Sequence, residues 1–333
     1  MVRVTTTARL HIGFLDPSGR GERPFGSFGL SLDRPRTSLT LVPARSFQVS
    51  GPERERALRY LKSIAQSCGI EAAYRLHIDE AIPPHAGLGS GTQLALAVGS
   101  AFAALEGLDL GPQEIAARLG RGARSGIGIT TFAQGGVVLD SGPEDGELPE
   151  LVSRVAFPAE WRVLLLFDSE ASGLAGSNET AAFDALPDFP QSEIAELRRR
   201  VAQGALPALA AHDFAGFSEQ VGYLQARMGA YFAPLQGGPY TSPRVSAALD
   251  WLHRNGIVGL GQSSWGPTGF AFVASEAEGK RLLDELCGRA KHSSLSFDLA
   301  KGRNEGAEIE TNLAGDRGQP PHGGASGGRA SPD

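Results

Sequence analysis

The first forty residues alternate between apolar and polar side chains with the period of two that is typical of β-strands. Strand-like segments cover residues 2–14 and 37–42, and both are rich in β-branched residues. The segment between them, residues 15–29, contains four glycines and two prolines and is predicted to be a loop. The chain is therefore expected to begin with β structure.

Periodic apolar positions and helix-capping residues predict a mixed sequence of helices and strands after this beginning. Helices are expected over residues 53–69, 90–105, 111–122, 242–256 and the segment after 275, and residues 178–228 are expected to be mostly helical with breaks at Pro187 and Pro190. Ser242 followed by Pro243, and Ser275 followed by Glu278, are typical of helix N-termini. Further strands are expected over residues 72–82, 135–142, 161–170, 257–275 (interrupted by a loop) and 293–300.

This order of elements predicts an α+β protein of two lobes. We expect an N-terminal lobe over residues 1–160 and a C-terminal lobe over residues 161–312. Residues 313–333 contain mainly glycine, proline and polar residues, and we expect this tail to be disordered.

Composition and charge narrow the class of protein. The net charge of −6 argues against a nucleic-acid-binding protein, which would carry a basic surface. Cys68 and Cys287 lack partners at the spacing of metal ligands and are predicted to be ordinary thiols. Neither a signal peptide nor a membrane-spanning segment is apparent, so we expect a cytoplasmic protein that does not interact with a membrane.

A glycine-rich turn at residues 83–93, PPHAGLGSGTQ, leads directly into the apolar helix. The N–H groups at a helix N-terminus attract anions, and glycines let the backbone approach them closely. Ser90 and Thr92 would add hydroxyl groups. The segment is not a P-loop, because no Lys-Ser or Lys-Thr pair follows, and its glycine spacing is not that of a dinucleotide-binding turn. The alternative is a tight connection that binds nothing.

A second glycine-rich segment covers residues 121–136, RGARSGIGITTFAQGG. Arg124 and Ser125, beside flexible glycines, are suited to holding an anion. The alternative is a loop whose glycines allow close backbone packing. The segment contains no acidic residue, and the first one after it is Asp140 in a predicted strand.

A third polar segment, GQSSWGPT at residues 261–268, connects two predicted strands. Polar groups at strand ends commonly form the rim of a ligand site. Trp265 could form a wall for an aromatic ring or could simply cover the core. The other residues expected to shape such a pocket are Gln262, Ser263, Ser264 and Thr268.

Charged and polar residues near both ends of the chain are further candidates. His11 would share a strand face with Arg9, and it could contact a phosphate or a ring substituent or be a core histidine. Asp16 in the following turn could bind a divalent metal. Lys301 and Arg303 follow the last predicted strand, and the alternative for both is a solvated basic turn.

The first glycine-rich turn resembles the P-x-x-x-G-L-G-S-S motif of the GHMP superfamily of small-molecule kinases. Pro83 and Gly87 to Ser90 match this motif, whereas Gly91 replaces its second serine. The resemblance implies a turn that wraps phosphates, an N-terminal lobe like ribosomal protein S5 domain 2 and a ferredoxin-like C-terminal lobe. Kinases of the superfamily place a catalytic aspartate near residues 121–136, and its absence here argues against a kinase.

Several segments together resemble one branch of that superfamily, the β-ribofuranosylaminobenzene 5′-phosphate synthases of tetrahydromethanopterin biosynthesis. The resemblance is carried by ARLHIGFLD, PPHAGLGSGTQLALAV, RSGIGITTFAQGGVVLDSG, GQSSWGPTGFAF and GRNEGA. It implies a decarboxylating glycosyltransferase that joins 4-aminobenzoate to phosphoribosyl pyrophosphate and releases pyrophosphate and CO2. A homodimer is also implied. A GHMP kinase acting on a small alcohol and a non-catalytic regulator that binds a phosphometabolite remain the alternatives.

The resemblance also assigns roles to the candidate residues. Mg²⁺ is expected as the cofactor, in contact with Ser90 and Asp16, and pyridoxal phosphate is not expected. His11, Asp16, Arg124 and Ser125 are expected to act in the reaction, the last two by holding an anionic group. Lys301 and Arg303 are expected to close over a phosphate or the departing carboxylate. The residues expected to bind phosphate are Gly87, Leu88, Gly89, Ser90, Gly91 and Thr92.

Overall fold

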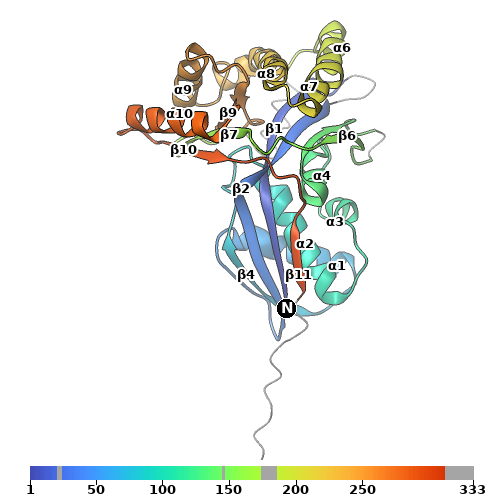
Figure 1. The fold of residues 1–333 in the computed structure, drawn as a ribbon. Coiled ribbons are helices and arrows are strands. Elements are labelled where there is room, and N and C mark those ends of the chain that lie inside the picture. Colours follow the sequence, from blue (N-terminus) through green and yellow to red (C-terminus); the bar gives the residue numbers. More distant parts are fainter. Residues whose placement is uncertain (21–24, 145–146, 174–185, 312–333) are drawn as a thin grey trace, which may run out of the picture.

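The computed structural model describes residues 1–20, 25–144, 147–173 and 186–311, and it contains two β-sheets with helices packed against them (Figure 1). The strands are β1 (Val2–Asp16), β2 (Phe25–Ala44), β3 (Gln48–Ser50), β4 (Ala73–Glu80), β5 (Val137–Asp140), β6 (Leu151–Val155), β7 (Arg162–Asp168), β8 (Leu260–Gln262), β9 (Gly269–Val273), β10 (Leu295–Ala300) and β11 (Glu308–Thr311). The helices are α1 (Arg54–Ser67), α2 (Ser90–Glu106), α3 (Pro112–Arg118), α4 (Ile127–Gln134), α6 (Gln191–Arg200), the π-helix η1 (Val201–Ala205), α7 (Leu206–Ala210), α8 (Phe214–Gln236), α9 (Pro243–Arg254) and α10 (Glu276–Arg289).

The first sheet has the strand order β11-β1-β2-β4-β3, and β5 and β6 extend it beyond β2. Neighbouring strands are antiparallel except for β3 and β4. Helices α1 and α2 cover one face, where Leu61 and Leu94 pack with Leu39 and Leu76 of the sheet. This arrangement follows from the alternation along β4, because Tyr74, Leu76 and Ile78 are all buried as predicted.

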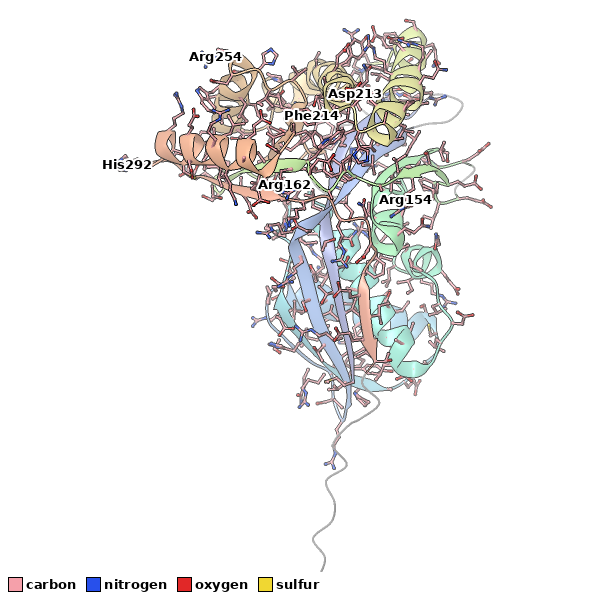
Figure 2. All side chains as sticks on the ribbon, in the orientation of Figure 1. Arg154, Arg162, Asp213, Phe214, Arg254 and His292 are labelled. Carbon is pink, nitrogen blue, oxygen red and sulfur yellow. The ribbon has the colours of Figure 1, made fainter. Side chains whose placement is uncertain are left out.

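The second sheet has the antiparallel order β10-β7-β9-β8. Helices α9 and α10 pack against it through Val245, Leu249, Leu282 and Leu286. Arg162 at the start of β7 donates a 2.8 Å hydrogen bond to Glu276 of α10, which ties the sheet to its covering helix (Figure 2).

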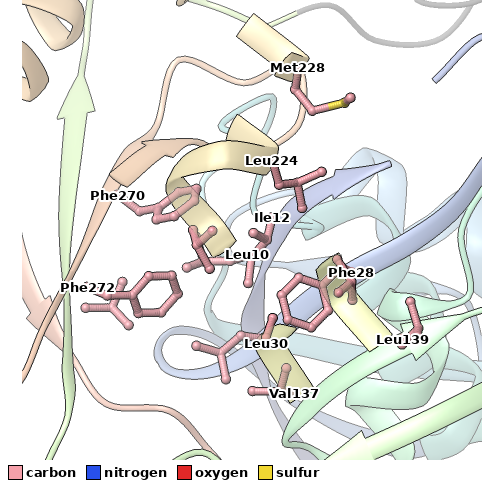
Figure 3. Close-up of a cluster of buried hydrophobic side chains, with 14 of the residues drawn as sticks. Leu10, Ile12, Phe28, Leu30, Val137, Leu139, Leu224, Met228, Phe270 and Phe272 are labelled. Carbon is pink, nitrogen blue, oxygen red and sulfur yellow. The ribbon is translucent and has the colours of Figure 1, made fainter. Parts of the chain in front are cut away.

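The long β1–β2 hairpin connects the two sheets. Val2 and Val4 lie in the core beneath α1 and α2. Further along the same strand, Leu10 and Ile12 pack with Leu224 of α8 and with Phe270 and Phe272 of β9 (Figure 3). One continuous strand therefore carries residues 8–16 from the first core into the contact with the second sheet.

Local capping patterns predicted the helix starts correctly. Ser242 accepts a hydrogen bond from Val245 N at 3.1 Å, and Ser275 accepts one from Glu278 N at 3.2 Å. The start of α8 is capped in the same way by Asp213 (Figure 2), which the sequence pattern had not singled out.

Other segments differ from the prediction. Strand β2 begins at Phe25, inside the segment predicted to be a loop, because it pairs with β1 as far as Asp16. Residues 127–134 form helix α4, and β11 near the end of the chain joins β1 in the first sheet. The boundary at residue 160 stays a prediction, and the tail beyond residue 311 lies outside the described residues. Within the described ranges, no helix is both long and apolar enough to cross a membrane.

Candidate active site

The first glycine-rich turn adopts the conformation that its glycines permit. Gly87 and Gly89 have φ angles of +79°, and Gly89 is the N-cap residue of α2. In the part of the chain that the structure describes, no side chain caps this helix start. The N–H groups of Ser90, Gly91 and Thr92 have no intrahelical carbonyl to bind, so this end of α2 is suited to an anion.

Arginines from three other elements surround this turn. A Cβ atom at Gly89 would lie 3.1 Å from Cγ of Arg9, and Arg9 donates a 2.8 Å hydrogen bond to the carbonyl of Gly87. A Cβ atom at Gly91 would lie 3.1 Å from Nη2 of Arg121 and 3.8 Å from Nη1 of Arg56. These guanidinium groups reinforce the positive end of the helix dipole. Arg56 and Arg121 had not been singled out, because they reach the turn only through the fold.

The glycine-rich turn packs directly on the turn at residues 263–266. The hydroxyl of Ser263 donates to Gly87 O at 2.8 Å and accepts from the backbone N–H of His11 at 3.0 Å. A Cβ atom at Gly87 would lie 2.1 Å from Ser263 O, and one at Gly266 would lie 2.2 Å from Gly87 N. Only glycine fits at both positions. The structure therefore brings two segments 176 residues apart into one site.

A narrow cavity lies on the other side of the Ser263 turn. Its free volume is about 30 Å³, and its walls come from β1, α8 and the residues after β8. Trp265 lines it and packs on Phe232 with ring centroids 4.3 Å apart. Trp265 is only 3% exposed and belongs to the core cluster, which agrees with a role in covering the core. It also lines the cavity, where a wall for an aromatic ring would have to lie. The other lining residues are His11, Ile12, Gly13, Phe14, Gln225, Met228, Gly229, Gln236, Pro239, Gln262 and Ser264.

The polar walls of this cavity are held by glutamine amides. Gln225 of α8 accepts a hydrogen bond from Gln262 N at 2.8 Å and donates to Gln262 O at 3.2 Å. Gln225 also donates to Ile12 O, so it joins β1, α8 and β8. The side-chain oxygen of Gln262 accepts from Thr241 N at 2.6 Å. Sequence reasoning had no signal for Gln225, whose partners lie 37 and 213 residues away.

Thr268 lies outside this cavity. It lines a separate hollow with Pro83, Pro84 and Asp168, although its carbonyl accepts the N–H of Ser263 at 3.0 Å. Thr268 therefore stabilises the turn at residues 263–266 through its backbone carbonyl. The structure does not bring its side chain to the cavity beside Trp265.

The second glycine-rich segment surrounds a buried carboxylate. Asp140 accepts hydrogen bonds from Gly126 N and Ser27 N, both at 2.7 Å, and from Gly142 N at 3.0 Å. The hydroxyl of Ser125 donates to the same carboxylate at 3.3 Å. Burial raises the pKa of Asp140 to about 6, although these donors act in the opposite direction.

This geometry corrects the expectation for Ser125. A second anion bound by Ser125 would lie beside the Asp140 carboxylate, where like charges repel. The arrangement fits the alternative of a segment built for packing. Arg124 lies on the same turn and is half-buried.

The structure does not bring Asp16 and Ser90 together. Arg9 N bonds to Leu88 O beside the glycine-rich turn, whereas Asp16 lies seven residues further along β1. Seven residues of extended strand span roughly 20 Å. Asp16 is fully buried and accepts hydrogen bonds from the N–H and hydroxyl of Ser18 at 3.1 and 2.6 Å. The structure therefore does not support the expectation that both residues contact one Mg²⁺ ion, and the role of Asp16 in metal binding stays a prediction.

Lys301 and Arg303 also lie away from the glycine-rich turn. The N–H of Lys301 donates to Asp33 at 2.8 Å. The guanidinium of Arg303 donates to Gly306 O at 2.9 Å and to Glu308 at 2.8 Å, at the C-terminal end of α4. The opposite end of this helix faces Thr92. The geometry supports the alternative of a structural basic turn.

Two family models match the chain. The model described as GHMP kinases N terminal domain covers residues 55–136, and the model described as GHMP kinases C terminal covers residues 205–292. The chain is 30% identical over 332 residues to a β-ribofuranosylphenol 5′-phosphate synthase from Archaeoglobus fulgidus, covering 93% of this chain and all of that protein. A protein of the same name from Methanothermobacter thermautotrophicus is 27% identical, with 91% and 97% of the two chains covered.

Solved structures of low sequence identity share the fold. The galactokinase of Lactococcus lactis aligns with a TM-score of 0.64 at 15% identity, covering 92% of this chain and 95% of that one. The homoserine kinase of Cytophaga hutchinsonii gives 0.62 at 17% identity, with coverages of 93% and 97%. Mevalonate diphosphate decarboxylase from Staphylococcus aureus gives 0.61 at 16% identity, with coverages of 93% and 99%. The predicted two-lobed GHMP-like α+β fold is confirmed.

Proposed function

The chain belongs to the β-ribofuranosylphenol 5′-phosphate synthase family within the GHMP superfamily and is an enzyme, and we propose that it is a decarboxylating phosphoribosyltransferase. The proposed substrates are phosphoribosyl pyrophosphate and 4-aminobenzoate, with tetrahydromethanopterin biosynthesis as the pathway. The relatives are named for a phenol product, so 4-hydroxybenzoate is the alternative acceptor. The observation that carries the proposal is the contact between Gly87 and Ser263, which sets a phosphate-binding turn beside a cavity lined by Trp265.

The N-terminus of α2 would bind a phosphate group of the sugar substrate. The N–H groups of Ser90, Gly91 and Thr92 supply donors, and the guanidinium groups of Arg56 and Arg121 supply positive charge. These groups stabilise pyrophosphate as negative charge accumulates on it. The turn would therefore lower the barrier for departure of the leaving group.

The chemistry requires no base that takes a proton from a hydroxyl. The C1–O bond of the ribose breaks, and its electron pair leaves with pyrophosphate. The ring carbon that bears the carboxylate then bonds to ribose C1, assisted by electron donation from the amino group in the para position. Loss of CO2 returns the electron pair of the C–C bond to the ring and restores aromaticity. The atoms and charges balance without an oxidant or a further cofactor.

The residues at the turn could hold Mg²⁺ only with few ligands from the protein. Among the described residues, no three His, Cys, Asp or Glu side chains gather as metal ligands. Mg²⁺ commonly binds substrate phosphates and water with few protein ligands, and Ser90 offers a hydroxyl at this position. The ion would neutralise charge on the leaving pyrophosphate.

A kinase would need a group to orient the attacking hydroxyl. The acidic residue that follows the second glycine-rich segment is Asp140, and its oxygens already accept from three backbone N–H groups and Ser125. Asp140 is therefore engaged in packing α4, and this observation favours the transferase over the kinase.

The proposal is tested by incubating the protein with carboxyl-labelled 4-aminobenzoate, phosphoribosyl pyrophosphate and Mg²⁺. We expect labelled CO2 and pyrophosphate in equal amounts, and parallel reactions with 4-hydroxybenzoate rank the two acceptors. ATP consumption with an alcohol and no release of label would indicate a kinase. Binding of phosphoribosyl pyrophosphate without products would indicate a regulator. We further propose a homodimer, and light scattering at working concentrations tests it.

A further inference from the structure

His11 lines the cavity beside Trp265 and has a buried ring nitrogen without a partner in the described part of the chain. The residue is 2% exposed, and its Nε2 atom has no hydrogen-bond partner among the described residues. An unsatisfied buried polar atom destabilises the folded protein, and such atoms in native proteins commonly face a water molecule or a ligand. Its position in the cavity wall indicates that a partner enters from this space.

The neighbouring polar groups do not satisfy this nitrogen. Gln225 and Gln262 line the same cavity, but their amides are already bonded. The amide of Gln225 binds the backbone of Gln262 and Ile12, and that of Gln262 binds Thr241 N, Ser264 O and the side chain of Gln236. Phe14 packs on the imidazole with ring centroids 4.3 Å apart and offers no polar group. Burial and the nearby charge of Arg9 lower the pKa of His11 to about 3. The imidazole is therefore neutral near pH 7 and can accept a hydrogen bond.

The size of the cavity limits what can enter. A free volume of about 30 Å³ holds a group of the size of a water molecule. An amino or hydroxyl substituent is therefore the part of a substituted benzoate that fits the space beside His11 most readily. The apolar side chains of Trp265, Phe232 and Met228 at the same cavity suit the ring that carries such a substituent.

The cavity also lies in the direction that the proposed reaction requires. Ser263 bonds to Gly87 on one side and to the backbone of His11 on the other, so the phosphate-binding turn and the cavity adjoin at this residue. The ring carbon that attacks the sugar must face the phosphate-binding turn. The substituent in the para position points the opposite way, toward His11.

We infer that Nε2 of His11 accepts a hydrogen bond from the para substituent of the acceptor ring and thereby selects benzoates that carry a small hydrogen-bond donor. This inference rests on the proposed function. His11 would act here as a specificity-determining residue: it would orient the ring and would assist electron donation from the substituent toward the reacting carbon.

The test measures binding of three benzoates to the full chain by calorimetry, in the presence of Mg²⁺ and pyrophosphate. We expect 4-aminobenzoate to bind about tenfold more tightly than unsubstituted benzoate, because one hydrogen bond distinguishes them. 4-(Dimethylamino)benzoate lacks the N–H donor, so we expect it to bind no better than benzoate. Equal affinity of the native protein for 4-aminobenzoate and benzoate would overturn the inference.

Variants separate recognition from a structural role. His11→Leu should reduce the affinity for 4-aminobenzoate to that for benzoate without lowering the melting temperature, because it removes an unsatisfied buried nitrogen. His11→Gln should restore part of the preference. His212→Leu, at an exposed histidine that pairs with Glu160, should leave the preference unchanged. A His11→Leu protein that retains the tenfold preference would contradict the inference, and if this variant does not fold, the ligand series on the native protein still decides.

The proposed reaction and the proposed role of His11 can be contradicted independently of each other. Release of CO2 without any preference among the benzoates would leave the proposed reaction in place and overturn the role of His11. A clear preference for 4-aminobenzoate without release of CO2 would support the role of His11 and overturn the reaction. Absence of binding by all three benzoates, together with no CO2, would overturn both.

Discussion

The two glycine-rich segments of this protein have similar local sequences and different surroundings. Each leads into a helix, α2 after residues 83–89 and α4 after residues 121–126. The start of α2 has no capping side chain among the described residues, and Arg56 and Arg121 lie beside it. At the start of α4, Gly126 N donates to the buried carboxylate of Asp140. A helix N-terminus attracts anions in both cases, but at α4 the protein supplies the anion itself.

The comparison shows that a glycine-rich turn before a helix is an incomplete signal for a phosphate site. Its function depends on whether another part of the chain already satisfies the helix N-terminus. Asp140 lies 14 residues after Gly126, and the β5 strand returns it to the helix start. Four experiments test this difference between the two segments.

The largest effect is expected at the close packing of the first turn. Gly87→Ala should destabilise the protein by about 3 kcal/mol or more, because its Cβ atom would meet Ser263 O at 2.1 Å. Gly120→Ala is the matched control, since Gly120 also has a positive φ, +61°, but no atom lies near its Cβ position. It should cost about 1 kcal/mol. Denaturant unfolding measures both, and equal losses would mean that the contact with Ser263 is not rigid.

The carboxylate at the second segment should give a pH-dependent effect. The pKa of Asp140 is about 6 in the folded protein and 3.8 for an ordinary aspartate. The folded state therefore binds more protons between these values, and the contribution of Asp140 to stability is complete below pH 4 and is lost as the pH rises through 6. The change corresponds to about 3 kcal/mol. Asp140→Asn should lack this change, so the difference in unfolding free energy between the two proteins should vary over this interval. A constant difference would show that the N–H donors keep the carboxylate ionised.

A smaller effect is expected from two serine variants, which distinguish a hydroxyl that binds substrate from one that only stabilises the fold. Ser90→Ala should raise KM for phosphoribosyl pyrophosphate about tenfold with little change in stability, because the hydroxyl lies at the open helix start. Ser125→Ala should leave that KM within twofold and should lower stability by about 1 kcal/mol, because it removes a hydrogen bond to Asp140. Steady-state kinetics and thermal unfolding of both variants provide the measurement. The reverse pattern would assign the phosphate to the second segment.

The smallest effect is expected at Asp16, which lies far along β1 from the start of α2. Asp16→Asn should leave the Mg²⁺ concentration that gives half-maximal activity unchanged, although loss of its bonds to Ser18 should cost some stability. Titration of activity with Mg²⁺ gives this concentration. A severalfold increase would return Asp16 to the metal site.

Local sequence patterns predicted the features that depend on neighbouring residues. Ser242 and Ser275 cap their helices as expected, because a capping side chain binds an N–H three residues away. The glycines of the first turn and the alternation along β4 were predicted for the same reason. The family motif predicted the overall fold, because it identified the chain as GHMP-like.

The sequence by itself thus determined the starts of α9 and α10, the buried face of β4 and the glycine turn that precedes α2. Only the tertiary structure decided that Gly87 packs on Ser263, that Gln225 closes the cavity and that Asp140 occupies the start of α4. These partners lie 176, 37 and 14 residues apart in the chain. Their contacts form through packing between elements, and the spacing of residues within one element does not predict such contacts.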